Sequence, residues 1–276
     1  MTDTGFGIEP QDEETLRRIC GSIRERAPLI HCITNYVTVN DCANALLAIG
    51  ARPVMSHAPQ EAAEITSASD ALVLNLGGTE YMDAMFLSAA AAKEKGIPVV
   101  IDPVGIGGSS WRREKLKGLM EICTPTVIRG NRAEIGTLVG TGTKEAGVDY
   151  TGDGHEMKRL AAAAGEYALE HGMVLAATGT TDIVTDGRTL KLSGLGDPEM
   201  SRVTGTGCMS SALLGAFLAA GRSLGYSDAV SCTAQIHYMG MAGKRAGQRT
   251  KELGGGTGTY RVQLIDALDR PGWDWQ

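Results

Sequence analysis

The feature that most constrains the fold of this chain is a repeated alternation of short apolar runs with longer helix-forming stretches. Three of the runs, at 71–76, 98–101 and 173–177, are almost continuously apolar. Such strands are typical of a sheet that is covered by helices on both faces. The alternation therefore predicts an α/β fold, with a mostly parallel central sheet inside a three-layer αβα sandwich.

The expected elements can be placed along the chain from their patterns. Helices are expected at 41–51, 59–69 and 84–96, with another ending at 166–172, and strands at 52–57, 71–77, 97–105, 126–131 and 173–179. Asp186-Gly187 separates two β-rich segments, which predicts a hairpin and some antiparallel pairing at one edge. No long linker or repeat divides the sequence, so residues 1–276 are expected to form one domain, with 1–27 as an N-terminal extension and first helix.

One segment, Val203–Gly221, runs for nineteen residues without a charge. Its apolar part, from Met209 to Ala220, is shorter than the roughly twenty residues that a membrane span needs. A buried core helix is the better interpretation, and no membrane association is expected. The net charge of −6 and the lack of a basic cluster also argue against nucleic-acid binding.

The six cysteines have no CxxC pair and no metal-ligand spacing. The first residues are polar and acidic, without the features of a secretory signal. We therefore expect a cytoplasmic protein with reduced thiols. Five of the thiols are interpreted as small buried hydrophobic groups. Cys208 differs because it follows two glycines at an expected helix start.

Polar residues directly follow most of the apolar runs. Ligands of open parallel sheets bind at the carboxyl ends of the strands, so these residues should converge on one rim. They lie at 56–57, 75–79, 102–109, 129–134, 178–182 and 205–208. Gly205-Thr206-Gly207 before a long helix could bind an anion through backbone N–H groups, although an ordinary helix start looks the same. No Walker A lysine follows, and no GxGxxG with a ribose-binding acid is present, which disfavours P-loop and nicotinamide enzymes.

Several motifs together resemble a known family. They are "PLIHCITNYVTVNDCANALLAIGARPVMSHAPQEAAEI", "IDPVGIG", "IRGNRAEI", "ATGTTDIVTDG" and "VTGTGCMSSALLGAF". In this order and spacing they resemble hydroxyethylthiazole kinases, a ribokinase-like family of bacterial thiamine metabolism. The resemblance implies a ribokinase-like fold and a homotrimer. It also implies Mg²⁺-dependent transfer of the γ-phosphoryl group of ATP to the primary alcohol of 4-methyl-5-(2-hydroxyethyl)thiazole.

The resemblance also implies roles for individual residues. Met55, Asn35 and Gly205 would contact the thiazole; Arg129, Asn131 and Thr178 would bind ATP; Asp102 and Glu134 would hold Mg²⁺; and Gly205, Thr206, Gly207 and Cys208 would cradle the transferring group. Gly207 is expected to need either a positive φ or close approach to phosphate.

The chemistry of these side chains supports the roles, but structural alternatives remain open. A guanidinium presents a planar fork to phosphate, and carboxylates are the hard oxygen ligands that Mg²⁺ takes. Asp102 could equally be a turn former and Glu134 a helix-start acid. Met55 could be a core residue and Asn35 a loop cap. His31 and His57 are interpreted as structural.

Cys208 stands where much of the superfamily has an aspartate as the presumed base. A helix N-terminus lowers a thiol pKa, so the sulfur could accept a proton, but we expect much of the rate to come from Mg²⁺ and the anion cradle. Arg132 is a departure from many relatives, and it adds a cation near the nucleotide. Two rival functions are a kinase for another small alcohol, such as hydroxymethylpyrimidine, and a non-catalytic thiazole- or nucleotide-binding regulator.

Overall fold

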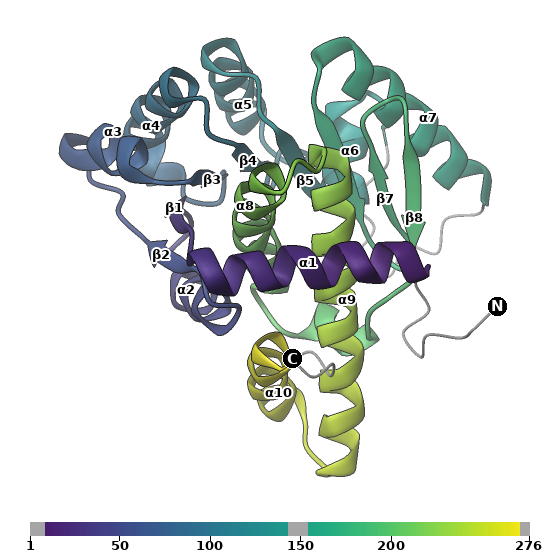
Figure 1. The fold of residues 1–276 in the computed structure, drawn as a ribbon. Coiled ribbons are helices and arrows are strands. Elements are labelled where there is room, and N and C mark those ends of the chain that lie inside the picture. Colours follow the sequence, from purple (N-terminus) through teal and green to yellow (C-terminus); the bar gives the residue numbers. More distant parts are fainter. Residues whose placement is uncertain (1–8, 143–153, 271–276) are drawn as a thin grey trace.

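The computed structural model describes residues 9–142 and 154–270, which are arranged around a single sheet (Figure 1). Within these residues the sheet has eight strands in the order β2-β1-β3-β4-β5-β6-β7-β8. Neighbouring strands from β2 to β6 are parallel, while β7 and β8 are antiparallel to their neighbours. The strands are β1 (Leu29–Ile33), β2 (Arg52–Val54), β3 (Ala71–Asn75), β4 (Val99–Asp102), β5 (Val127–Asn131), β6 (Val174–Thr178), β7 (Asp182–Thr185) and β8 (Leu190–Ser193).

Helices cover both faces of the sheet and complete the three-layer αβα sandwich, which confirms the predicted fold class. One face carries α3 (Pro59–Ala68), α4 (Met82–Lys95), α5 (Ser110–Ile122), α6 (Arg132–Leu138) and α7 (Gly154–His171). The other face carries α8 (Thr206–Ser223) and α9 (Asp228–Glu252), on which α1 (Pro10–Arg26), α2 (Val39–Ala48) and α10 (Thr257–Asp269) pack. Two short 3₁₀ turns, Thr79–Tyr81 and Pro198–Arg202, lie in loops.

Strand β3 shows why its sequence lacks polar alternation. Ala71 and Val73 belong to the apolar cluster under α8, whereas Leu72 and Leu74 belong to the cluster under α4. Every residue of the strand is buried. Both faces of the strand are therefore covered, as the apolar run predicted.

The predicted hairpin is confirmed at the β8 edge of the sheet. β7 pairs with β8 in antiparallel register. In the turn, Asp186 Oδ1 accepts hydrogen bonds from the N–H groups of Arg188 and Thr189, and Gly187 has a φ of +81°. A short acceptor side chain followed by a glycine is the chemistry that such a turn requires.

Helix α8 is the buried core helix expected from the uncharged segment. Most of its length, including Leu213 and Phe217, is fully buried. Gly215 lets the helix approach the sheet closely, because a Cβ there would lie 2.8 Å from Val73 Cγ2. Among the described residues, no helix combines the length and the apolar character that crossing a membrane requires.

Candidate active site

The carboxyl ends of β3, β4, β5 and β6 meet the first turn of α8 at one rim of the sheet, and side-chain hydrogen bonds join them. Asn75 at the end of β3 donates to Asp102 at the end of β4. Arg129 of β5 donates to Thr178 of β6 and to the backbone oxygen of Gly207 in α8. The structure thus brings together residues that the sequence places more than a hundred positions apart.

Asp102 is the more deeply buried carboxylate of this rim, with 2% of its surface exposed. Its Oδ2 accepts two hydrogen bonds of 2.9 Å, one from Asn75 Nδ2 and one from Ser211 Oγ. Burial raises the pKa of Asp102, and the nearby Arg129 guanidinium, together with the two donors, acts in the opposite direction. A cation at this carboxylate would offset the cost of burying its charge.

Glu134 closes the start of α6 while also lying next to Asp102. Its Oε2 accepts from the backbone N–H of Asn131 at 2.8 Å, and Asn131 Oδ1 accepts from the N–H of Glu134 at 2.8 Å, which completes a capping box. Its Oε1 accepts from the N–H of Gly105 at 3.1 Å. Burial, and then the charge of Asp102, raise the pKa of Glu134 to about 7. Glu134 is therefore a helix-start acid, and it also adds a second buried carboxyl to the rim.

Arg129 lies beneath the first turn of α8 and is 9% exposed. Its Nη1 donates to Gly207 O at 3.1 Å and its Nη2 to Thr178 Oγ1 at 2.7 Å. Its buried Nε has no hydrogen-bond partner in the part of the chain that the structure describes. A buried donor without a partner is costly, so this guanidinium is suited to receive an anionic ligand at the rim.

The glycine loop forms the start of α8 and presents free backbone donors. Gly205 is the N-cap with a φ of +90°, and Met209 N makes the first helical hydrogen bond, to Gly205 O. The N–H groups of Thr206, Gly207 and Cys208 lie in this first turn, where no intrahelical partner exists. The positive φ therefore belongs to Gly205 and not to Gly207. The missing side chain of Gly207 makes room for Arg129, since a Cβ there would lie 2.9 Å from Nη1.

Cys208 faces two amide side chains. Asn75 Nδ2 lies 3.3 Å and Asn35 Nδ2 lies 3.5 Å from Cys208 Sγ. Asn35 also caps its own loop, because its Oδ1 accepts from the N–H groups of Val37 and Thr38. Burial, and then the Asp102 charge, raise the pKa of Cys208. This corrects the expectation of a lowered thiol pKa: burial and a neighbouring anion outweigh the helix N-terminus.

The remaining predicted residues surround this centre. Met55 follows β2 and packs, partly buried, against the core on the α8 side. His31 is fully buried, with Nδ1 2.8 Å from Thr66 Oγ1 and Nε2 2.9 Å from Ser56 O. His57 is exposed and its ring lies against that of Tyr81, tilted by 32° with ring centroids 4.1 Å apart. Both histidines thus have structural partners, in line with the structural interpretation.

Two residues of the rim had no individual role in the sequence interpretation, although Asn75 begins the 75–79 segment that was expected there. Asn75 and Ser211 both donate to Asp102, and each is 1% exposed. Asn75 carries a usable signal, because a polar residue within an apolar run has to find partners at the strand end. Ser211 carries none, since a serine inside an apolar helix usually donates to its own backbone.

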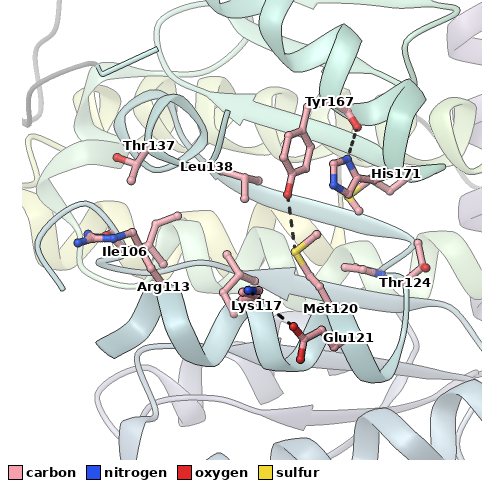
Figure 2. A pocket seen from close by; sticks show the side chains of 13 residues that line it. Ile106, Arg113, Lys117, Met120, Glu121, Thr124, Thr137, Leu138, Tyr167 and His171 are labelled. Atoms are coloured by element: carbon pink, nitrogen blue, oxygen red, sulfur yellow. Dashed lines mark hydrogen bonds and ion pairs between the residues drawn. The ribbon is translucent and has the colours of Figure 1, made fainter. Parts of the chain in front are cut away.

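A separate cavity of about 410 Å³ lies between α5 and the pair α6 and α7 (Figure 2). Its wall includes Tyr167, whose hydroxyl donates to Met120 Sδ at 3.8 Å, and His171, which stacks on Tyr167. No residue predicted for the site lines this cavity. The residues predicted for the site therefore lie away from this cavity.

Comparisons with known proteins find relatives that match most of this chain. The model of the hydroxyethylthiazole kinase family matches residues 21–270. Hydroxyethylthiazole kinases of Ruminiclostridium cellulolyticum and Methanocella arvoryzae are 41% and 40% identical, over 92% and 94% of both chains. The structure of a hydroxyethylthiazole kinase from Pyrococcus horikoshii superposes with a TM-score of 0.78 at 35% identity, covering 95% of this chain and 94% of that one. A ribokinase-like superfamily protein from Enterococcus faecalis shares the fold, with a TM-score of 0.59 at 11% identity over 95% and 96% of the chains.

Proposed function

The chain belongs to the hydroxyethylthiazole kinase family, and we propose that it phosphorylates the primary alcohol of 4-methyl-5-(2-hydroxyethyl)thiazole at the rim around Arg129, Asp102 and Cys208. ATP is the phosphoryl donor, and the product is the thiazole phosphate used in thiamine biosynthesis. One observation supports the assignment of the reaction to this rim. Arg129 and the first turn of α8 lie at the same rim as the two buried carboxyls, and both provide hydrogen-bond donors there.

Phosphoryl transfer needs positioning and neutralisation of charge more than covalent help from the protein. Arg129 supplies a cation that its hydrogen bonds to Gly207 O and Thr178 Oγ1 hold under the first turn of α8. The N–H groups of Thr206, Gly207 and Cys208 supply neutral donors at a helix N-terminus, where an anion is favoured. Thr178 and Asn131 stand at neighbouring strand ends and are proposed to contact the nucleotide.

Asp102 and Glu134 fit a magnesium site, because both are buried and the charge of Asp102 acts on Glu134. Among the described residues no group of three metal-ligating side chains occurs, and Mg²⁺ commonly needs only one or two carboxylates beside phosphates and waters. When bound, Mg²⁺ would neutralise the charge on the phosphate oxygens. Asp102 and Glu134 would hold it, and Ser211 and Asn75 would keep Asp102 in place.

The alcohol is proposed to bind between Asn35, Met55 and Gly205, with Cys208 beside its hydroxyl. Because the pKa of Cys208 is raised, its sulfur carries a proton at neutral pH. A loose transition state does not require an alcohol that is deprotonated in advance. Cys208 therefore orients the hydroxyl, and Arg129 stabilises the negative charge of the transferring group; a cation held by the two carboxyls would add to this stabilisation.

We also propose that the protein is a cytoplasmic homotrimer, in which Asn35 and Met55 of one site come from different chains. Two apolar side chains next to Asn35 support a subunit contact there: Tyr36 is 74% and Val37 58% exposed. Large apolar side chains this exposed, side by side, are typical of an interface. The free thiols support a reducing compartment, since all six cysteines are unpaired.

An ADP-release assay with a panel of alcohols tests the function. The thiazole alcohol should be turned over with Mg²⁺ and ATP at least about tenfold faster, by kcat/KM, than hydroxymethylpyrimidine, since one misfitting group in a pocket costs about 1–3 kcal/mol. Asp102→Asn should abolish most of the turnover with the fold retained. Preference for another alcohol would favour the broader kinase, and no turnover on any alcohol would favour a binding regulator.

A further inference from the structure

The amide side chain of Asn75 connects the two halves of the proposed site, and all four of its hydrogen-bonding positions are used. Its Nδ2 donates to Asp102 Oδ2 at 2.9 Å and to Cys208 Sγ at 3.3 Å. Its Oδ1 accepts from Gly77 N at 2.9 Å and from Asn35 Nδ2 at 3.2 Å. An asparagine offers two donors and two acceptor lone pairs, so each has one partner. Asn75 is 1% exposed, which leaves little access for competing water.

The orientation of this amide is fixed by its neighbours. The backbone N–H of Gly77 can only donate, so the atom of Asn75 that faces it has to be the oxygen. The NH₂ group then has to face Asp102 and Cys208. Gly77 also leaves space for this arrangement, because a Cβ there would lie 2.7 Å from Asn75 Oδ1 and 3.2 Å from Asn35 Nδ2.

We propose that Asn75 is a positioning residue, which fixes the Cys208 sulfur and the Asp102 carboxylate relative to one another. This inference rests on the proposed function. With Ser211, Asn75 occupies Asp102 Oδ2, and the other oxygen, Oδ1, accepts no hydrogen bond from the described residues. With Asn35, it directs two N–H groups at Cys208 Sγ. The sulfur proposed to lie beside the alcohol and the carboxylate proposed to hold the metal are thereby joined by one buried amide group.

The substitution Asn75→Asp tests the two N–H donors of Asn75 separately from its acceptor oxygen. Aspartate has the same shape and keeps both acceptor contacts, to Gly77 and Asn35, but it loses the NH₂ group. A protonated aspartate could donate only once, and Asp102 Oδ2 is the nearer acceptor, at 2.9 Å against 3.3 Å for Cys208 Sγ. Cys208 therefore loses a donor in either protonation state of the new side chain.

The first measurement is the reaction of the free protein with iodoacetamide, without nucleotide or alcohol. The other five thiols are at most 4% exposed, so Cys208 is the thiol that reacts in the folded protein, and its signal should vanish in Cys208→Ala. Alkylation proceeds through the thiolate. Without the Asn75 donor, and with a negative group in its place, the labelling rate should fall at least about tenfold.

The second measurement is steady-state turnover. For Asn75→Asp we expect a kcat at least about tenfold lower, since the sulfur and the carboxylate lose their common support. The KM for the thiazole alcohol should stay within about threefold, because Asn35 keeps its partner. Asn75→Ala also removes the acceptor of Asn35, and should therefore both lower kcat and raise this KM.

Gln235→Glu is the matched control. Gln235 is a fully buried amide that donates to Ser210 Oγ of the same helix α8 at 3.1 Å, outside the rim. This change places a buried acid under α8 and costs stability, but labelling and kcat of the folded protein should stay within about twofold. If Asn75→Asp acted only by a general loosening of the core, labelling and kcat would change to the same extent in both variants.

The outcomes separate this inference from the proposed function. Unchanged labelling and a kcat within twofold in folded Asn75→Asp would overturn the inference. If Asn75→Asp does not fold, Asn75→Ala replaces it in the test, because it buries no new charge. A kcat of folded Asn75→Ala within twofold of wild type would then overturn the inference. Slower labelling of Asn75→Asp together with no turnover by the wild type on any alcohol supports the positioning role and contradicts the kinase assignment.

Discussion

At the scale of single residues, Glu134 has two tasks that one substitution can separate. It accepts hydrogen bonds from two N–H groups, that of Asn131 at the helix cap and that of Gly105 in the loop after β4. As a buried carboxyl its pKa is raised to about 7, from an ordinary value of 4.5. Between these two pH values the folded protein holds a proton that the unfolded chain releases. This contribution to stability is present at acid pH and is lost as the pH rises through about 7.

Glu134→Gln should remove that pH dependence. The amide places an NH₂ group against one of the two N–H donors, which costs about 1–3 kcal/mol at every pH. In urea unfolding of the metal-free proteins, the variant should have a lower free energy of unfolding than the wild type. This difference should be smaller at pH 8 than at pH 6. Mg²⁺ should raise the wild-type midpoint more at pH 8 than at pH 6, and should not raise that of the variant.

At saturating Mg²⁺ the kcat of the variant should be sharply reduced, and near-wild-type turnover would contradict the metal assignment.

The glycine loop yields a second prediction at this scale, based on the backbone. Cys208→Ala should slow kcat by about tenfold, less than the roughly 10²–10⁴-fold that loss of a general base costs, because the protonated sulfur is proposed to orient the alcohol and not to act as its base. Gly207→Val should be more harmful, since a Cβ lies 2.9 Å from Arg129 Nη1 and displaces the guanidinium. The check is steady-state kinetics on variants whose fold is confirmed by circular dichroism. An inactive Cys208→Ala beside an active Gly207→Val would contradict the anion cradle.

At the scale of elements, the apolar runs predicted most of the sheet, and the exceptions have physical causes. Strand β1, Leu29–Ile33, was not recognised because His31 interrupts its apolar run; its ring is buried only because Thr66 and Ser56 supply partners from distant elements. The strand expected at 52–57 ends at Val54, since β2 is an edge strand with one neighbour. The contacts of Asn75 to Asn35 and Cys208 cross 40 and 133 positions, which no local pattern reveals.

The packing of α8 on the sheet gives an element-scale prediction. A methyl group at Gly215 would lie 2.8 Å from Val73 Cγ2 and 3.1 Å from Ile30 Cγ2, two buried β-branched side chains that cannot turn away. Gly215→Ala should therefore destabilise the protein by about 1–3 kcal/mol, despite the better helix propensity of alanine. The measurement is the free energy of unfolding in urea.

Gly21→Ala is the matched control for this change. Gly21 also lies inside a helix, α1, but a Cβ there would have no atom within 4 Å. The substitution should stabilise the protein by about 0.5–1 kcal/mol, because only the conformational entropy of the chain changes. Equal effects of the two substitutions would show that α8 does not depend on this close approach.

At the scale of the whole molecule, one chain supplies all the groups proposed for the phosphoryl side of the site, while the loop proposed for the alcohol side is exposed. Asn35 and Cys208 of the same chain are in contact, but the loop beyond Asn35 exposes Tyr36 and Val37. A second subunit covering this loop would both bury the apolar side chains and close the alcohol pocket. Light scattering should then give about 87 kDa, three times the 29.0 kDa of the chain.

Mixing impaired subunits tests whether the site is shared between chains. In a trimer that combines Cys208 and Asn35 of one chain with Met55 of its neighbour, Met55→Glu and Cys208→Ala damage opposite sides of the interface. The two proteins are mixed in equal amounts, unfolded together and reassembled. Each site then has an intact Cys208 in half of the cases and an intact Met55 in half, so about a quarter of the sites should have both. Mixing Asn35→Ala with Cys208→Ala should restore nothing, since these residues belong to the same chain. Recovery of activity only in the first mixture supports the shared site. A fully active 29 kDa monomer, or no recovery in mixtures shown to form mixed trimers, would place the whole site within one subunit.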